Sequence, residues 1–322
     1  MREFARPKVV VSRCLEFEAC RWNGAMISSD VVRLLKPHVD FHPVCPEAEI
    51  GLGIPRNSIR IISEKGELRL MQHKTERDVT EAMKGFASGF LSSLDDVDGF
   101  ILKYRSPSCG LKDVNQYPGL EKARSVGKGS GFFAGAVLKR FSQFPIEDEG
   151  RLNNYRIREH FLTSLFTLAD FREVRTSGKM KNLVRFQAQN KFMLMSYNQK
   201  EMRILGSIVA NHEKRPAVRV VEEYEEHLRS AFQNMPRYTS NINVLMHALG
   251  YFPKDLSPKE RSFFLDSLEQ YRNEKVPLSV PLNIARSWIV RFENEYLMNE
   301  TFFEPYPQDL IEITDSGQGR KL

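Results

Sequence analysis

Residues 99–110 read GFILKYRSPSCG, an apolar tetrapeptide that runs into a loop of serines, a proline, a cysteine and a glycine. Two earlier stretches share this layout: residues 9–14 read VVVSRC, and residues 39–46 read VDFHPVCP. In each, a short run containing β-branched or aromatic residues ends near a cysteine, which is typical of a buried strand followed by a loop. The three stretches predict the strands at the centre of an N-terminal domain.

Helix and hairpin patterns lie between these strands. Ser28 and Ser29 are candidate N-caps for a helix over residues 31–35, and a second helix places apolar residues at helical spacing from Val79 to Phe90. Residues 59–70 predict a hairpin that turns at Glu64-Lys65-Gly66. Because strands that alternate with helices indicate βαβ units, we expect an α/β domain with a mainly parallel sheet.

The pattern changes near residues 145–150, which read PIEDEG, an acidic link with a helix breaker at each end. Beyond it, apolar residues keep helical spacing over residues 218–232, 264–271 and 284–292. A chain of 322 residues is long enough for two domains. We therefore predict an α/β domain over residues 1–148 and an all-α domain over residues 149–322.

The composition is that of a folded globular protein, with 41% hydrophobic and 27% charged residues. No apolar run approaches the roughly 18–20 residues that span a bilayer, and the first eight residues lack the apolar core of a signal peptide. We therefore expect a cytoplasmic protein that does not associate with membranes. In that reducing compartment the four cysteines would be free thiols, metal ligands or catalysts. No feature indicates an obligate protein partner.

Three cysteines occupy equivalent positions in the predicted fold. Cys14, Cys45 and Cys109 each follow the carboxyl end of a predicted strand, and such ends meet at the ligand-binding crevice of an open α/β sheet. Cys20 follows in the first loop and could join them. The sequence has no CxxC pair, so the spacing leaves three interpretations open: buried structural thiols, an iron–sulfur cluster with three protein ligands, and zinc or thiol chemistry.

Polar residues accompany these cysteines. Glu47 lies two residues after Cys45, while Ser106 and Ser108 precede Cys109, so a general base and hydroxyl donors would stand beside the thiols. Candidate substrate-binding residues are Ser108 and three residues that follow Cys20 and offer a cation, a flat ring and an amide, namely Arg21, Trp22 and Asn23.

A basic segment lies in the predicted helical domain. Residues 172–203 contain eight basic and two acidic residues, with Phe186, Phe192 and Tyr197 interleaved. Basic side chains can neutralise phosphates and aromatic faces can stack on bases, although a solvated helix face has the same composition. Candidate RNA-binding residues are Arg175, Lys181, Arg185, Lys191 and Arg203.

Four blocks of the first half resemble the TudS-type thiouracil desulfidase family over about residues 7–150. They are residues 11–15 (VSRCL), 20–24 (CRWNG), 45–56 (CPEAEIGLGIPR) and 106–110 (SPSCG). The remainder resembles the YbgA-like helical domain at residues 191–195 (KFMLM), 243–252 (NVLMHALGYF) and 276–282 (VPLSVPL). A chain that joins the two domains resembles the RudS-like tRNA 4-thiouridine desulfidases.

The resemblance implies a [4Fe-4S] cluster on Cys14, Cys45 and Cys109, with Cys20 near the site rather than on iron. It places Glu47 and Ser106 at the family's catalytic positions. The implied reaction is a non-redox desulfuration of 4-thiouridine in tRNA, which yields uridine and hydrogen sulfide, with tRNA bound by the helical domain.

Two departures from the family's patterns bear on recognition. The first loop reads Arg21-Trp22-Asn23-Gly24, where the family often has Arg-Tyr-Asp-Gly, and Gln187 and Gln189 stand where His and Arg are expected. The alternatives are a desulfidase for free thiolated uracils or nucleosides, and a non-catalytic, metal-bearing RNA-binding protein.

Overall fold

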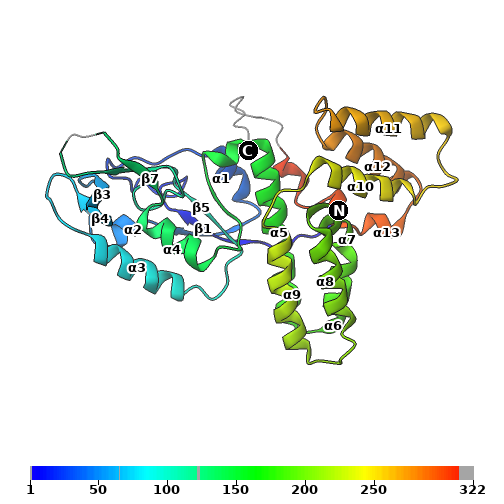
Figure 1. The fold of residues 1–322 in the computed structure, drawn as a ribbon, viewed down its shortest axis with the longest axis horizontal. Helices are drawn as coiled ribbons and strands as arrows, with labels where there is room; N and C mark the ends of the chain where they lie inside the picture. Colours follow the sequence, from blue (N-terminus) through cyan, green and yellow to red (C-terminus); the bar gives the residue numbers. More distant parts are fainter. Residues whose placement is uncertain (1, 65, 122–123, 312–322) are drawn as a thin grey trace. The chain divides into compact units, whose positions relative to one another are not determined.

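The computed structural model describes residues 2–64, 66–121 and 124–311, which divide into two compact units. One unit contains residues 4–169 and 307–311, and the other contains residues 170–306 with residues 2–3. The predicted fold class is confirmed, because an α/β region with a parallel sheet precedes a mainly helical region (Figure 1).

The sheet that carries the predicted strands has the order β2-β1-β5-β8, and all its pairings are parallel. Its strands are β2 (Asp40–Val44), β1 (Lys8–Ser12), β5 (Gly99–Leu102) and β8 (Ile146–Asp148). The first three are the predicted central strands. The fourth lies in the acidic link, where the sequence gives no strand pattern, and it forms because Ile146 and its neighbours pair with the open edge of β5.

A second, mixed sheet has the order β4-β3-β6-β7. The predicted hairpin is confirmed by β3 (Ile59–Glu64) and β4 (Glu67–Gln72), which pair antiparallel, while Lys65 in its turn lies outside the described residues. The strands β6 (Val114–Tyr117) and β7 (Gly127–Gly129) were not predicted. Two of the three residues of β7 are glycine. Because glycine is uncommon in strands, this segment lacks the β-branched and aromatic residues from which a strand is predicted.

Helices cover the parallel sheet. Helices α3 (Thr80–Ser92) and α4 (Phe132–Arg140) pack side by side, and their Met83 and Phe133 share a core with Val10 and Phe100 of the sheet (Figure 1). The predicted cap of α1 (Asp30–Leu35) is confirmed at Ser29, whose hydroxyl accepts the Val32 N–H at 3.5 Å. The four-residue helix α2 (Pro46–Glu49) directly follows Cys45.

Helix α5 (Tyr155–Ser177) passes from one unit into the other at Ala169 and Asp170. Its first part is largely apolar and buried, and it lies so close to β5 that a Cβ at Gly99 would be 2.9 Å from Leu165 Cδ1. This packing assigns the start of α5 to the α/β unit, so the compact helical unit begins at Asp170.

The remaining elements are helices. They are η1 (Arg151–Asn153), α6 (Met180–Gln189), α7 (Lys191–Tyr197), α8 (Gln199–Ala210), α9 (Ala217–Ala231), α10 (Tyr238–Leu249), α11 (Pro258–Arg272), α12 (Ser279–Arg291), α13 (Glu295–Met298), η2 (Thr301–Phe303) and η3 (Gln308–Leu310). Within the described ranges, no helix combines the length and the apolar composition needed to cross a bilayer.

Candidate active site

The loops at the carboxyl ends of β1, β2 and β5 enclose a pocket of about 250 Å³ in the α/β unit. All four cysteines line it: Cys14, Cys20, Cys45 and Cys109. The last three are buried and Cys14 is half-buried. The structure therefore brings together thiols that are up to 95 positions apart in the chain (from 14 to 109), as expected for loops at one edge of a parallel sheet.

Two glycines hold the Cys109 loop against the start of α4. A Cβ at Gly131 would lie 2.5 Å from the Ser108 carbonyl oxygen, and one at Gly110 would lie 2.4 Å from Val114 Cγ2. The bare backbone lets the Gly131 N–H donate to the Gly110 carbonyl at 2.7 Å, and the Ala134 N–H donates to the Ser108 carbonyl at 3.0 Å. The glycine-rich stretch before α4 thus serves to seat the loop that carries Ser106, Ser108 and Cys109.

The short helix α2 positions Glu47. Cys45 occupies its N-cap position, and the Cys45 carbonyl accepts the Ala48 and Glu49 N–H groups at 3.0 Å each. Pro46 at the first helical position fixes the backbone for this turn. Glu47 is therefore held directly beside a cysteine of the pocket, and it is buried.

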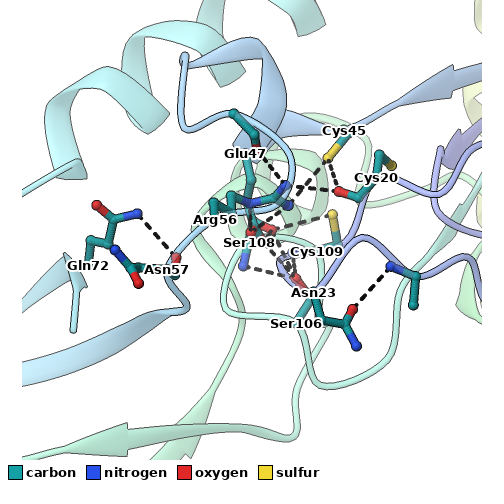
Figure 2. Close-up of polar contacts among 12 residues, drawn as sticks. Cys20, Asn23, Cys45, Glu47, Arg56, Asn57, Gln72, Ser106, Ser108 and Cys109 are labelled. Atoms are coloured by element: carbon teal, nitrogen blue, oxygen red, sulfur yellow. Dashed lines mark hydrogen bonds and ion pairs between the residues drawn. The ribbon is translucent and has the colours of Figure 1, made fainter. Parts of the chain in front are cut away.

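The Glu47 carboxylate is the centre of a hydrogen-bond network (Figure 2). Its Oε1 accepts the Ser108 hydroxyl at 2.7 Å and lies 3.5 Å from Ser106 Oγ, while its Oε2 accepts Arg56 Nε–H at 2.9 Å. The two serine hydroxyl oxygens are 2.9 Å apart. The network joins a carboxylate to two hydroxyls at the wall of the thiol-lined pocket, which is an arrangement suited to moving protons.

Ser106 also supports the loop on which it lies. Its hydroxyl oxygen accepts the backbone N–H of Ser108 at 3.3 Å and that of Cys109 at 3.2 Å. The Ser106 side chain thus fixes the backbone that presents both the second hydroxyl and a thiol.

Arg56 is a site residue that sequence reasoning missed. Its side chain is only 3% exposed, and besides Glu47 it donates to the Cys20 carbonyl at 2.9 Å and to the Gly53 carbonyl at 3.0 Å. One of its terminal nitrogens lies 3.8 Å from Cys45 Sγ. Arg56 is the last residue of the 45–56 block, which was the one signal that could have identified it. A single arginine in a loop is usually exposed, so the sequence alone does not predict its burial.

The protein environment disfavours free thiolates in the pocket. Burial raises the pKa of Cys20 and of Cys109 to about 12, and burial together with the neighbouring thiols raises the pKa of Cys14 well above its usual range. Thiols in such surroundings lose their protons when a cationic centre binds them. The donor set therefore fits an iron–sulfur cluster, which is held by thiolates.

Among the described residues, no three His, Cys, Asp or Glu side chains are arranged to hold a single metal ion. A [4Fe-4S] cluster would instead be held through thiolates, which Cys14, Cys45 and Cys109 would supply from three separate loops.

The predicted substrate-binding residues divide into two groups. Arg21 and Trp22 line the pocket, as does Ser108, and Trp22 is 47% exposed. Asn23 is not among the lining residues. Its side-chain oxygen accepts the Ala25 N–H at 3.2 Å and so closes a turn in the loop (Figure 2).

The basic segment of the helical unit presents exposed cations. Lys181, Arg185, Lys191 and Arg203 are exposed on α6, α7 and α8, whereas Arg175 is half-buried and pairs with Glu225 at 2.8 Å.

The expectation that interleaved aromatic residues stack on bases is wrong for this segment. Phe186 is buried against Phe171 and Tyr224, and Phe192 is buried against Tyr251 and Phe303. Tyr197 is half-buried against Phe232, with ring centroids 4.5 Å apart. These rings alternate with the cations because they form the apolar faces of the helices. Gln187, one of the departures noted above, accepts the Tyr224 hydroxyl at 2.6 Å.

Comparisons with known proteins divide the chain in the same order. Residues 9–149 match the 2-thiouracil desulfurase family, and residues 191–307 match a family described as Protein of unknown function (DUF1722). YbbK of Bacillus subtilis is 31% identical over 153 residues, which cover 45% of this chain and 98% of YbbK. YbgA of Escherichia coli is 24% identical over 168 residues, which cover 52% of this chain and 99% of YbgA.

One solved structure is also similar to the chain, that of the [4Fe-4S]-dependent thiouracil desulfidase TudS. It is 26% identical, and the match covers 46% of this chain and 93% of TudS with a TM-score of 0.36.

Proposed function

The chain belongs to the 2-thiouracil desulfurase family, with its desulfidase domain joined to a YbgA-like domain, and from that membership we propose that it desulfurates 4-thiouridine in tRNA. The proposed reaction consumes one water and yields uridine and hydrogen sulfide. The observation that carries the proposal is the thiol-lined pocket in which Glu47 and Ser108 are hydrogen-bonded to each other.

The proposed cofactor is a [4Fe-4S] cluster held by Cys14, Cys45 and Cys109, the three cysteines that follow strands of one sheet. When bound through three thiolates, such a cluster has one iron open to act as a Lewis acid toward the substrate's sulfur. Cys20 is proposed as a neighbour. Its thiol lines the same pocket, and its carbonyl accepts a hydrogen bond from Arg56 at 2.9 Å.

The residues around the cluster site supply the proton transfers. Glu47 acts as the general base that takes a proton from the water attacking C4 of the base. Ser108 holds the carboxylate in place, and Ser106 relays a proton toward the ring as the C–S bond breaks. Acid–base assistance of this kind contributes about 10²–10⁴-fold to a rate. No electron is gained or lost, so the chain needs no redox partner for this reaction.

The helical unit is proposed to bind the RNA. A base inside a folded tRNA has to be splayed out to enter a pocket, at a cost of a few kcal/mol, and contacts with the phosphate backbone offset that cost. The exposed cations Lys181, Arg185, Lys191 and Arg203 supply such contacts. These exposed cations favour tRNA as the substrate over the alternative class, which is free thiolated uracils and nucleosides.

The test is reconstitution of the full chain with iron and sulfide under anaerobic conditions. The reconstituted protein is incubated separately with thiolated tRNA, 4-thiouridine and 2-thiouracil, each at the same concentration. The hydrogen sulfide released and the loss of the thiolated base are measured. We expect the highest kcat/KM with tRNA. A higher value with the free compounds would assign the activity to small substrates, and a loaded cluster without hydrogen sulfide from any substrate would overturn the proposed reaction.

The role of the helical unit is tested by charge reversal. Arg185→Glu is expected to lower the ratio of the tRNA rate to the nucleoside rate, more at low salt than at high salt, because it removes a phosphate contact. Arg272→Glu is the matched control, since Arg272 is an exposed arginine at the end of α11 in the same unit. Equal losses on both substrates for Arg185→Glu would contradict RNA binding at this surface.

A further inference from the structure

Two tyrosines at the surface of the helical unit stack on each other. Tyr251, two residues after the end of α10, and Tyr296 of α13 have ring centroids 5.2 Å apart and an angle of 5° between the ring planes. Tyr251 is 41% exposed and Tyr296 is 38% exposed. Because one face of each ring is turned toward the other ring, a ligand could reach the pair only at its two outer faces.

The third ring of this cluster lies beside the pair and not over it. The Phe192 centroid is 6.1 Å from that of Tyr251 and 6.3 Å from that of Tyr296, with interplanar angles of 71° and 76°. A ring over one outer face would be much nearer to that tyrosine than to the other. The nearly equal distances therefore place Phe192 at the side of the stack, where it leaves both outer faces uncovered.

Hydrogen bonds fix Phe192 in this position. Its backbone N–H donates to the buried Glu300 side chain at 3.0 Å, and the Asn190 side chain, directly before α7, accepts the Thr301 hydroxyl at 2.8 Å. Both contacts join the start of α7 to the chain that follows α13. The tyrosine pair thus rests on an ordered support, so little conformational freedom is lost when a flat ligand stacks on it.

A positive charge next to the pair indicates the class of ligand. Lys191 directly precedes Phe192, is exposed at the first residue of α7, and is one of the exposed cations of the unit. Aromatic faces with cations nearby are typical of sites for single-stranded nucleic acid, in which bases stack on the rings and phosphates pair with the cations. The Tyr251–Tyr296 pair supplies the exposed rings that the basic segment itself lacks.

We propose that Tyr251 and Tyr296 form a stacking site for an unpaired base of the bound RNA, while Lys191 pairs with a neighbouring phosphate. The inference rests on the RNA binding proposed above for the helical unit, and it specifies an unpaired nucleotide as what that unit recognises. Every base has a flat π face, so such a site selects unpaired RNA without selecting a sequence. A base inside a duplex is covered by its stacked neighbours and cannot use the site.

The first test measures the Kd of the reconstituted full chain for a tRNA transcript without thiolated bases, so that no turnover accompanies binding. Tyr251→Ala and Tyr296→Ala should each raise this Kd about 10-fold, the effect expected for one lost stacked base. Tyr251→Phe should bind like the unmodified protein, because phenylalanine keeps the flat face. Phe263→Ala is the matched control and should leave the Kd unchanged, since Phe263 lies on α11 of the same unit and is 64% exposed.

Salt dependence separates stacking from charge pairing. Tyr251→Ala should raise the Kd by the same factor at every salt concentration. Lys191→Gln should instead reduce the slope of log Kd against log salt concentration by about 0.7, as expected for one lost phosphate contact with a single strand. A long, blunt-ended RNA duplex is the second ligand, and its Kd should be the same for Tyr251→Ala and the unmodified protein.

Urea unfolding identifies any variant that does not fold, and Tyr251→Leu, which keeps an apolar side chain without a ring, then replaces Tyr251→Ala. An unchanged Kd for tRNA in both tyrosine variants, or an equal loss on the duplex, would overturn the inference. A loss in Tyr251→Phe as large as that in Tyr251→Ala would also overturn it, because the effect would then belong to the hydroxyl.

Hydrogen sulfide release from free 4-thiouridine separates this inference from the proposed reaction. Tyr251→Ala should release hydrogen sulfide from the nucleoside at the rate of the unmodified protein. A Kd for tRNA that depends on the tyrosines, without hydrogen sulfide from any substrate, would retain the inference and reject the reaction. Normal release together with a Kd that the tyrosines do not affect would retain the reaction and reject the inference.

Discussion

The Ser108 hydroxyl lies 2.7 Å from Glu47 Oε1, while the Ser106 hydroxyl lies 3.5 Å from the same oxygen and 2.9 Å from Ser108 Oγ. Because a hydroxyl has a single proton to donate, the short contact uses the proton of Ser108, and Ser106 then donates to Ser108. The three groups form a chain from Ser106 through Ser108 to Glu47. The residue in direct contact with the proposed base is therefore Ser108.

This order predicts effects of different origin for the two serines. Ser108→Ala should lower kcat about 10- to 100-fold and the unfolding free energy by about 1.5–3 kcal/mol, because it removes a charge-assisted hydrogen bond from the buried Glu47 carboxylate. Ser106→Ala should lower kcat and also the unfolding free energy by about 1–2 kcal/mol, since two backbone N–H groups lose their acceptor. Steady-state kinetics and urea unfolding measure the two effects. Unchanged kcat in Ser108→Ala would remove that hydroxyl from the mechanism.

Glu47→Gln tests the proposed base itself. Glutamine keeps the size and most hydrogen-bonding capacity of glutamate but cannot take a proton, so we expect kcat to fall about 10²–10⁴-fold. Iron and sulfide content, measured on the same sample, should match the unmodified protein. Turnover at the original rate with a full cluster would show that another group accepts the proton.

The ion pair between Arg56 and Glu47 predicts a stability effect that is independent of the cofactor. Both side chains are largely buried, so Arg56→Met leaves Glu47 without its counter-charge and should lower the unfolding free energy by about 3–5 kcal/mol. Adding Glu47→Gln to that variant should recover part of the loss, because the uncompensated charge is then gone. Urea unfolding of the metal-free protein measures both. Additive losses in the double variant would show that the two residues are not coupled.

Cys20 and Cys45 should differ in their effect on the cluster. Cys45→Ala removes a proposed ligand and should reduce the bound iron and alter the visible absorbance of the reconstituted protein. Cys20→Ala keeps the backbone carbonyl that Arg56 holds, so the iron content should remain close to that of the unmodified chain. Equal iron losses in the two variants would instead make Cys20 a ligand.

Glu300 predicts a pH dependence of stability in the helical unit. Its side chain is 3% exposed and accepts the Phe192 N–H at 3.0 Å, and burial raises its pKa to about 7. The folded protein therefore binds this proton more tightly than the unfolded chain. The contribution of Glu300 to the unfolding free energy is complete below about pH 4.5 and is lost as the pH rises through 7. The unfolding free energy falls by about 3 kcal/mol over this range. Glu300→Gln should remove this component from urea unfolding curves recorded between pH 4.5 and 8. The exposed Glu295→Gln should retain it.

The sequence predicted most of the local elements, because apolar spacing and turn residues depend on a few neighbouring positions. These elements are the strands before Cys14, Cys45 and Cys109, the hairpin at residues 59–70 and the helices after residue 170. The strands β6, β7 and β8 could not be predicted in this way. Each is three or four residues long, and each exists because a longer strand offers it an edge.

The chemical identity of the site was fixed by the sequence. The residue types, their order and their place after predicted strands already put thiols, a carboxylate and two hydroxyls at one edge of a sheet. Only the tertiary structure decided which of these groups touch, that Arg56 is buried against Glu47, and that the aromatic residues of the basic segment face the core. The spacing of apolar residues along the sequence reflects local structure, which is set by residues close to one another in the chain. Burial and charge pairing are set by side chains that the sequence separates and the fold brings together.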